Sequence, residues 1–433
     1  MYSSIFIDGL FVAAVTLIWF MLGYQCLLFF LGHRYYRQMR LGLRKAPPEV
    51  SDAELPAVSI LVPCHNEDKV IAHTIRKLLA LEYPEGKLEI LIINDGSTDG
   101  TAEVVGGFTG DGRVRLLNVP PERAARGKSG ALNYALGQVS HPVIAIYDAD
   151  NMPEPGALRP LAAQLVIDPT LGAAIGMYRA WNRKRAFLTR FLNIEGIGFQ
   201  WILQAGRWML MHLTTLPGTN YVIRRSLVEQ LGGWDEQALT EDAELSIRIY
   251  QAGYRIQLIP ASVSWEQEPE GLKVWFRQRR RWVRGSNYLF QKYASKLLQT
   301  KPRRIGWELL YSLALYYVFF LAVVTSDVLF VLSVCGLVRI DVPGPYAMVW
   351  VFAYATFVGQ LVIALSCEPG EDTVTNILLT LLMYFTYCQL WIPVVAAAFY
   401  DDFIVRRAKT WAKTTRYEVS AGAAGTEPPP GPR

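Results

Sequence analysis

Charged residues are scarce in this chain of 433 residues, of which they make up 19%, while 52% of the residues are hydrophobic. Ordinary soluble domains carry roughly 25% charged residues, so the shortfall indicates contact with lipid. The formal net charge is only +5, which gives no indication of nucleic-acid binding. The length leaves room for one large soluble domain and several membrane segments.

Cysteine and histidine are equally sparse, with five of each. No two cysteines form a CxxC pair, and the histidines lack the spacing of metal ligands. A disulfide framework and a zinc site are therefore not indicated. The cysteines are Cys26, Cys64, Cys335, Cys367 and Cys388.

A nearly charge-free apolar run extends from Gly9 to Leu31, about the length that a helix needs to cross a bilayer. The run is too long for a signal-peptide core, and no small-residue cleavage site follows it. Basic residues come next, at Arg34, Arg37 and Arg40. Since positive flanks stay on the cytoplasmic side, we expect the following domain to lie inside the cell.

Three further apolar stretches run from Leu309 to Val338, Tyr346 to Ser366 and Thr375 to Tyr400. Three crossings would leave the basic tail outside and the acidic loop 368–372 inside, against the usual charge preference. The sequence therefore favours a hairpin or re-entrant pair within the first stretch, breaking near residues 325–327, and a cytoplasmic tail. Residues 421–433 are rich in Gly and Pro, and we expect them to be disordered.

The stretch between Pro56 and about Pro302 alternates strands with helices. Short apolar strands are predicted at Val58–Val62, Leu88–Ile93 and Pro142–Tyr147, with a helix following the first strand through Leu81. Apolar runs separated by helices predict a mostly parallel α/β sheet that is covered on both faces. Ligands bind beyond the carboxyl ends of the strands in such sheets.

Polar residues stand at each of these strand ends: His65-Asn66-Glu67, then Asp95 within residues 94–100, then Asp148-Ala149-Asp150. They should converge on one crevice. The segment around Asp95 would also suit a turn and a helix N-cap. Asp148 and Asp150 are two apart, so on an extended chain they face the same side. A divalent cation shared with phosphate oxygens would offset their repulsion.

These strand-end residues and four later motifs resemble those of the membrane-integrated family 2 glycosyltransferases, which include polysaccharide synthases and glycolipid synthases. The resemblance covers roughly Val58 to Gly285. It implies a GT-A (Rossmann-like α/β) cytoplasmic domain joined to an α-helical transmembrane bundle in the inner or plasma membrane. The domains would be residues 1–50, 51–302, 303–402 and 403–433. The later motifs are Gly127-Lys128, Gly232-Gly233-Trp234-Asp235, Thr240-Glu241-Asp242 and Gln278-Arg279-Arg280-Arg281-Trp282.

The resemblance also implies roles for single residues. Asp242 would be the general base, and Asp148 and Asp150 would hold Mg²⁺ or Mn²⁺. Glu241 and Trp282 would contact the acceptor. The nucleotide sugar would be bound by Asn66, Glu67, Asp95, Lys128, Asp148, Gln278 and Arg281.

Several of these residues also suit a structural role. Lys128 would fit an exposed loop, and Glu241 and Asp242 would complement the dipole of the helix that they begin. The arginines at 277, 279, 280 and 284 would suit anionic lipid headgroups. The apolar stretch Phe187–Leu213 fits a helix at the membrane interface as well as an ordinary core helix.

The resemblance implies inverting transfer from a UDP-sugar onto a growing β-linked polysaccharide in the bilayer, with accessory export subunits as further partners and no nucleic acid. One alternative is a glycolipid synthase that acts on diacylglycerol or a similar lipid. Another is a catalytically inactive membrane scaffold. Leu216-Pro217-Gly218-Thr219-Asn220 departs from the Phe-Phe-Cys-Gly segment of several polysaccharide synthases. This departure leaves the choice between polymer and glycolipid open.

Overall fold

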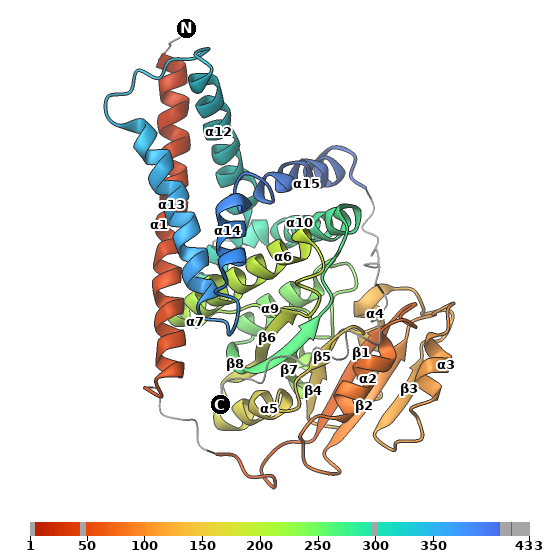
Figure 1. Cartoon of the computed structure of the whole chain (residues 1–433). Coiled ribbons are helices and arrows are strands. Elements are labelled where there is room, and N and C mark those ends of the chain that lie inside the picture. The colour runs from red at the N-terminus through yellow and green to blue at the C-terminus, as the bar shows by residue number, and fades with distance from the viewer. Residues whose placement is uncertain (1–4, 44–48, 297–298, 300, 408–416, 418–433) are drawn as a thin grey trace.

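The computed structural model describes residues 5–43, 49–296, 299, 301–407 and 417. Figure 1 shows two parts, an α/β domain and a group of long helices that rises from one side of it. This arrangement agrees with the predicted fold class.

The sheet has eight strands in the order β3-β2-β1-β4-β7-β6-β8-β5. The first four in that order pair in parallel, β7 is antiparallel to both neighbours, β6 and β8 are parallel, and β5 is antiparallel to β8. The predicted mostly parallel sheet is confirmed. The strands are β1 (Val58–Cys64), β2 (Leu88–Asn94), β3 (Val114–Asn118), β4 (Val143–Ile146), β5 (Met152–Pro153), β6 (Leu171–Ala180), β7 (Tyr221–Arg224) and β8 (Arg255–Glu266).

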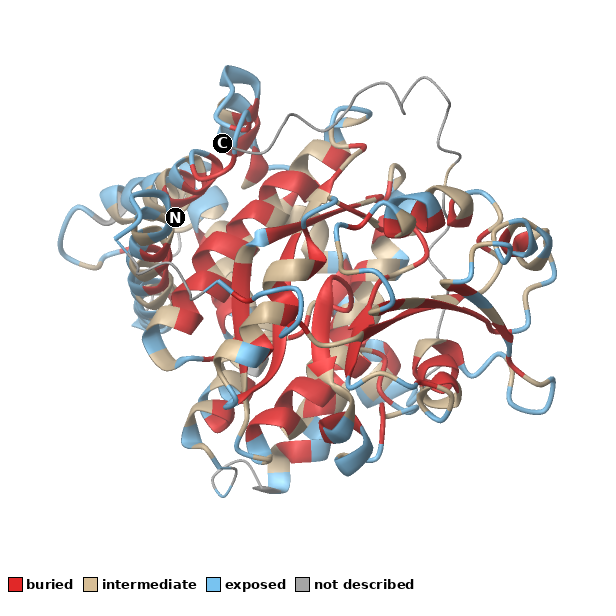
Figure 2. Ribbon diagram, turned by 90° about the horizontal axis from the view of Figure 1, so that it is seen from below, coloured by how far each residue is buried: buried red, intermediate tan, exposed pale blue. Residues whose placement is uncertain are grey.

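The central strands are buried because their runs of Ile, Leu and Val face helices on both sides of the sheet. Ile60, Leu61 and Val62 are wholly buried, as are the side chains of 90–93 in β2. Seen from below, the strands are buried along most of their length (Figure 2). The helices of this domain are α2 (Ile71–Leu79), α3 (Thr101–Gly106), α4 (Gly127–Leu136), α5 (Leu158–Ile167), α8 (Arg225–Gln230) and α9 (Glu241–Gln251).

A middle layer joins the domain to the long helices. It comprises α6 (Phe187–Gly198), the π-helical turn η1 (Phe199–Gln204), α7 (Ala205–Met211) and α10 (Leu272–Tyr293). Gly32 and Gly206 allow α1 (Ile5–Arg40) to approach closely, since a Cβ on Gly32 would lie 1.9 Å from the Trp201 carbonyl oxygen and one on Gly206 would lie 2.3 Å from that of Leu28. The stretch 187–213 therefore packs against both the α/β domain and the first long helix.

Three helices within the described residues are long and apolar enough to cross a membrane: α1, Arg303–Val334 and Met348–Leu365. The second combines α11 (Arg303–Leu313), η3 (Ala314–Phe319) and α12 (Phe320–Val334), and the third lies in α13 (Tyr346–Leu365). The predicted hairpin at residues 325–327 is wrong, because the helix continues through them. The polar side chains in this stretch form hydrogen bonds with neighbouring segments. The Ser326 hydroxyl accepts from the Trp350 indole at 2.6 Å, and Asp327 accepts from the Tyr384 hydroxyl at 2.7 Å.

The break occurs further along the chain, between Val374–Met383 and Cys388–Ile404, which are bent by 43°. These segments are α14 (Val374–Met383), η4 (Cys388–Leu390), α15 (Trp391–Phe399) and η5 (Tyr400–Ile404). Both ends of this bent pair contact the rest of the α/β part. Just before the pair, Glu371 binds Arg183 at 2.7 Å, and in its last turn Asp402 binds Arg284 of α10 at 2.8 Å.

The acidic loop 368–372 therefore lies against the α/β domain, where Glu368 also pairs with Arg179 at 2.8 Å. The expectation that this loop lies on the opposite side is wrong, because arginines of the domain neutralise its carboxylates. Tyr417 exchanges two backbone hydrogen bonds with the Gln267 side chain, at 2.8 and 3.0 Å. The described tail residue thus contacts the α/β domain, and the cytoplasmic placement of the tail stays a prediction. Residues 421–433 lie outside the described residues.

The arginines of α10 mostly face protein rather than lipid. Arg279 is buried and pairs with Glu195, Arg280 pairs with Asp401, and Arg284 is buried against Asp402. The lipid-headgroup interpretation is wrong for these three side chains, because acidic residues from other elements already neutralise them. Arg277 is exposed.

Candidate active site

A cavity of about 790 Å³ lies where the strand ends of the α/β domain meet α6, α10, α11 and α13–α15. It is lined at one end by Asp95, Lys128 and Asp148, and at the other by Trp282 and side chains of the long helices such as Gln360. We call these the donor end and the acceptor end, after the roles that the family resemblance implies for Asp95 and Trp282. One cavity thus joins the sheet edge to the helices that are candidates to cross the membrane.

Lys128 holds the centre of the donor end. It lies in the first turn of α4, and its Nζ lies 2.5 Å from Asp148 Oδ1 and 2.6 Å from the Gly218 carbonyl oxygen. Glu241 Oε1 lies 3.7 Å away. The side chain is 13% exposed, so Lys128 is not a solvent-exposed loop lysine. It provides a positive charge in the wall of the cavity.

Asp95 follows β2 and lines the cavity. Its Oδ1 accepts a hydrogen bond from the Ala125 backbone at 2.8 Å, and burial raises the pKa of its carboxyl. Glu67 is buried and also lines the cavity. Asn66 does not belong to the described lining, since its Oδ1 instead accepts from the Thr98 backbone at 2.7 Å. Asn66 has a φ of 58° and braces the loop behind the cavity.

Asp148 and Asp150 lie in different surroundings. Asp148 lines the cavity, and its side chain is 32% exposed. Asp150 does not belong to the described lining, and its Oδ2 accepts from the Gln267 backbone at 3.1 Å. The argument from an extended chain was wrong, because the chain turns at residues 149–150.

This arrangement still fits a metal that is bound together with substrate. Within the described residues, no group of three His, Cys, Asp or Glu side chains could hold a metal ion by itself. Mg²⁺, however, is commonly held by one or two carboxylates plus substrate phosphates. Asp148 supplies such a carboxylate beside Lys128, at the position where a diphosphate would meet the cavity wall.

Asp242 is the second residue of α9 and lines the same cavity. Burial and the neighbouring Glu241 raise the pKa of its carboxyl to about 7, while Lys128 and Arg281 act in the opposite direction. A general base works best with a pKa near the operating pH. Compensation of the helix dipole would not require Asp242 to lie in a cavity beside Glu241, Lys128 and Arg281. The surroundings of Asp242 therefore favour a functional role over a purely structural one.

Gly218 brings the backbone close to Asp242. Its φ is +89°, and a Cβ there would lie 3.1 Å from Asp242 Oδ2. Glycine is the residue that adopts this conformation without strain and leaves room for the carboxylate. The sequence analysis named the surrounding segment only as a departure from the family pattern, so this role of Gly218 was missed.

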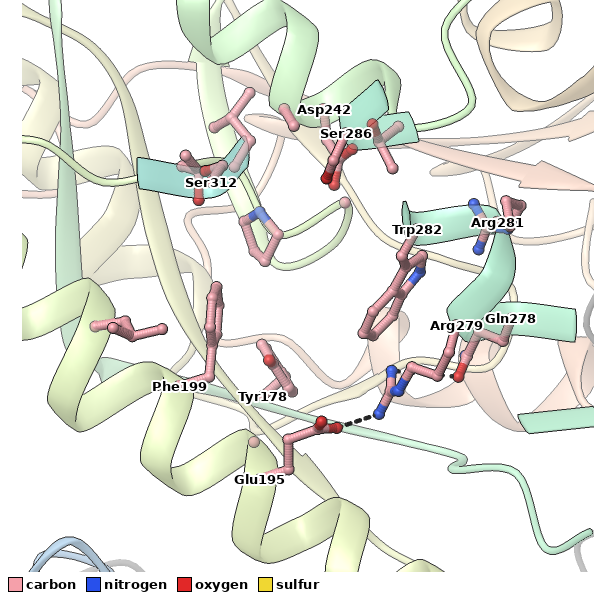
Figure 3. A pocket seen from close by; sticks show the side chains of 18 of the residues that line it. Tyr178, Glu195, Phe199, Asp242, Gln278, Arg279, Arg281, Trp282, Ser286 and Ser312 are labelled. Carbon is pink, nitrogen blue, oxygen red and sulfur yellow. Dashed lines mark hydrogen bonds and ion pairs between the residues drawn. The ribbon is translucent and has the colours of Figure 1, made fainter. Parts of the chain in front are cut away.

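Helix α10 supplies several side chains to the cavity wall. Gln278, Arg281 and Trp282 line the cavity as predicted, and so does Arg279. The Arg279 guanidinium lies 3.9 Å from the centre of the Trp282 ring and pairs with Glu195 of α6 (Figure 3). Arg279 and Glu195 were missed, because a helical-face argument places Gln278 and Arg279 on different sides, whereas the cavity extends around more than one face of α10.

The family is shown by sequence comparison. Residues 56–285 match the family model described as glycosyltransferase like family 2, which is more than half of the chain. The chain belongs to this family. It is also 40% identical over 414 residues to the probable glycosyltransferase YdaM of Bacillus subtilis, covering 95% of this chain and 98% of that protein. The protein is therefore a family 2 glycosyltransferase with a GT-A fold.

Two other comparisons add detail. The glycosyltransferase is 30% identical over 267 residues to the poly-β-1,6-N-acetyl-D-glucosamine synthase of Staphylococcus aureus (strain COL), covering 62% of this chain and 63% of that protein. The mannosyltransferase PcManGT of Pyrobaculum calidifontis, solved with GDP-mannose and Mn²⁺, is 21% identical with a TM-score of 0.60. That match covers 87% of this chain and 99% of PcManGT. At this identity the likeness supports the fold alone.

Proposed function

We propose that this glycosyltransferase transfers a sugar, with inversion, from a UDP-sugar to the end of a growing β-linked polysaccharide at the membrane. The observation that carries the proposal is the single cavity. It runs from Asp95 and Asp148, past Asp242 and Trp282, to the long helices. Its volume is about 790 Å³, which is within the usual range of roughly 300–1,000 Å³ for whole ligands and leaves room for an acceptor beside the donor.

The α/β domain is proposed to face the cytoplasm, where nucleotide sugars are made. The last turn of α1 on the side of this domain carries Arg37 and Arg40, and positive residues remain on the cytoplasmic side of a membrane. The described tail residue Tyr417 contacts the same domain. These observations support a placement of the basic flank, the family motifs and the described tail residue on one face of the bilayer.

The donor end supplies the groups that a UDP-sugar needs. Asp95 and Glu67 are carboxylates at strand ends, suited to accept hydrogen bonds from the nucleoside. Lys128 and Arg281 are cations that line the cavity and would lie against the diphosphate. Asp148, with Asp150 behind it, would hold Mg²⁺ or Mn²⁺, which as a Lewis acid would neutralise charge on the leaving UDP.

Asp242 would act as the general base. It removes the proton from the acceptor hydroxyl while that oxygen attacks the anomeric carbon, and the bond from that carbon to the UDP oxygen breaks. The pKa of about 7 leaves the carboxyl ionised in a useful fraction of molecules at neutral pH and basic enough to take the proton. A single displacement of this kind turns an α-linked donor into a β-linked product.

Two observations favour a polysaccharide acceptor. Trp282, Tyr178 and Tyr316 present aromatic side chains to the cavity, and aromatic faces pack well against sugar rings. The similarity to a poly-N-acetylglucosamine synthase agrees with this. A glycolipid product is the second candidate, because Phe357, Leu361 and other apolar side chains of the long helices line the same cavity and would suit acyl chains.

One experiment separates these possibilities. UDP release by the purified full-length protein is measured over a panel of UDP-sugars, with and without Mn²⁺, and the product is then sized and extracted with solvent. We expect release with at least one UDP-sugar, dependence on the metal, and a product of high mass. A short glycan in the lipid phase would instead establish the glycolipid alternative. No release with any donor would favour the inactive scaffold.

A further inference from the structure

The motif Gly232-Gly233-Trp234-Asp235 lies outside the described lining of the cavity. It opens the 233–240 loop, which connects α8 to α9 and leads directly into Glu241 and Asp242. The polar contacts of this loop are with the two helices that carry the cations of the site, α4 and α10.

At its start the loop is fixed to α4, whose first turn carries Lys128. The Asn133 side chain of α4 accepts from the Trp234 backbone N–H and donates to the Trp234 carbonyl oxygen, both at 2.8 Å. Gly233 makes this approach possible, since its φ is +81° and a Cβ there would lie 2.3 Å from Asn133 Oδ1. One side-chain amide thus binds both backbone polar groups of Trp234.

The rest of the loop is fixed to α10. Asp235 Oδ2 accepts from the Tyr288 hydroxyl at 2.6 Å and from Lys292 Nζ at 2.8 Å. Further along the loop, Arg281 Nη1 donates to the Leu239 carbonyl oxygen at 3.1 Å. These contacts extend along about three turns of α10.

The end of the loop and the start of α9 also lie against α10. A Cβ on Gly285 would lie 2.5 Å from the Thr240 side chain, so α10 passes directly beside the residue before α9. Lys292 Nζ lies 2.6 Å from Glu244, whose side chain is wholly buried in the first turn of α9. Helix α10 therefore holds this turn as well as the loop.

Asp242 lies in the same turn, near cations of both helices. Lys128 of α4 and Arg281 of α10 both oppose the rise in the pKa of the Asp242 carboxyl. The position of Gly218 agrees with this, since an added Cβ would lie 3.1 Å from Asp242 Oδ2 and 3.7 Å from Lys128 Nζ. Hydrogen bonds are directional, so the contacts of the loop restrict where this carboxyl can lie.

We propose that Asn133 and Asp235 are positioning residues for sugar transfer. They clamp the 233–240 loop between α4 and α10, and the clamp fixes the Asp242 carboxyl relative to the cations of the donor end. This inference rests on the proposed role of Asp242 as the base. A displacement of about 1 Å can lower a rate by up to about 10²-fold, so loss of either anchor should lower kcat without weakening donor binding.

Kinetics of the full-length protein in detergent separate a positioning role from a structural one. UDP release by Asn133→Ala and Asp235→Asn is divided by the number of UDP-binding sites, which calorimetric titration determines. We expect kcat per site to fall about tenfold or more, while the Kd for UDP stays the same. Unfolding alone would reduce the number of sites and not kcat per site. Unchanged kcat per site in both variants would overturn the proposal.

Asp168→Asn is a matched control. Like Asp235, Asp168 accepts from a backbone N–H two residues ahead at 2.9 Å, and it pairs with Arg255 at 3.0 Å. It lies outside the described lining and leads into β6 rather than α9. We expect thermal melting to show a similar loss of stability, with kcat per site unchanged. A fall in kcat equal to that of Asp235→Asn would contradict the clamp.

Hydrogen exchange measures the clamp without turnover. In Asp235→Asn, the backbone amides of residues 236–244 should exchange faster, because the loop and the first turn of α9 lose an anchor. The amides of β1 and β2 should exchange as in the wild type. If Asp235→Asn proves unstable, Tyr288→Phe takes its place, since it removes a hydroxyl that donates to Asp235. Unchanged exchange over 236–244 in a folded variant would refute the clamp.

Failure of the clamp and failure of the proposed base give different results. If Asp242→Asn is inactive while Asn133→Ala and Asp235→Asn turn over normally, the base stands and the clamp fails. If Asp242→Asn releases UDP as fast as the wild type, or if the wild type releases none, the proposed base fails, and hydrogen exchange alone decides on the clamp.

Discussion

The two ends of the cavity are built in different ways. The donor end sits on loops that follow the neighbouring strands β2, β1 and β4, so short contiguous motifs bring Asp95, Glu67 and Asp148 together. The acceptor end is assembled from helices far apart in the sequence: Glu195 lies on α6, Trp282 on α10, and Tyr387 just after α14.

Because of this difference, the proposed transfer step and the choice of acceptor depend on different parts of the fold. The donor end depends on the sheet, whose strand ends have fixed spacing. The acceptor end depends on how helices pack, and one substitution on any of them changes its shape. Relatives can therefore keep the same transfer step while changing what receives the sugar. The predictions below test whether the two ends act separately.

The largest effect is expected for Asp242→Asn, which removes the proposed base at the junction of the two ends. UDP release should fall by about 10²- to 10⁴-fold or more, while UDP binds as before because the donor end is intact. Kinetic assays and calorimetric titration with UDP measure the two quantities. Asp168→Asn, in an ion pair with Arg255 outside the described lining of the cavity, is the control. Turnover within tenfold of wild type in Asp242→Asn would refute the assignment.

Gly218→Ala should have the next largest effect, because its Cβ would lie 3.1 Å from Asp242 Oδ2. We expect transfer to fall by about 10- to 100-fold, since small displacements of reacting groups have effects of this size. Gly232→Ala is a matched control: its φ is +79°, but nothing lies within 4 Å of the added Cβ. Both variants carry backbone strain, as thermal melting will show. Equal loss of activity in both would attribute the effect to strain alone.

A smaller effect is expected for Glu195→Gln, which removes the charge partner of Arg279 and loosens its contact with Trp282. The KM for an acceptor oligosaccharide should rise about three- to tenfold, since the ion pair is replaced by a weaker hydrogen bond from Arg279 to an uncharged amide oxygen. The KM for the UDP-sugar should stay constant. Glu229→Gln, at an exposed pair on α8, is the control. A parallel change in both KM values would show that the two ends are coupled.

The smallest effect concerns pH. Because Asp242 must be ionised to act as a base and has a pKa of about 7, kcat/KM should be constant above that pH and fall about tenfold per unit below it. Glu241 raises this pKa. Glu241→Gln should therefore move the decline to lower pH, by roughly half to one unit. A shift to higher pH, or none in an active variant, would contradict the electrostatic account.

The sequence predicted the donor end better than the acceptor end. Asp95, Lys128, Asp148 and Asp242 were identified from motifs and line one cavity, because the ends of adjacent parallel strands meet at one edge of the sheet. Asn66 and Asp150 lie outside the described lining of the cavity, since local turns rotate their side chains away, and their roles stay predictions. Motif patterns do not record such turns.

On α10, Gln278 and Arg281 were predicted to bind the nucleotide sugar and Trp282 to contact the acceptor, and all three line the cavity. Arg279 of α10 and Glu195 of α6 were not predicted. Their pairing depends on how α6 and α10 pack, and hydrophobic patterns do not determine this. The membrane part was predicted as apolar stretches, but the break was assigned to residues 325–327. Polar residues inside an apolar run predict a turn only when no other part of the protein offers them a hydrogen-bond partner. Here Trp350 and Tyr384 are such partners, so the helix continues.

The ion pairs at the two ends of the bent pair α14–α15 bear on how the chain is made. Glu368, Glu371 and Asp401 are buried, and a buried carboxylate without its partner is strongly destabilising. Their partners Arg179, Arg183 and Arg280 all lie earlier in the sequence. During synthesis the α/β domain emerges first and offers these arginines before the last helices appear. The final membrane segments thus assemble on a folded domain, and a misfolded domain leaves them without a docking surface.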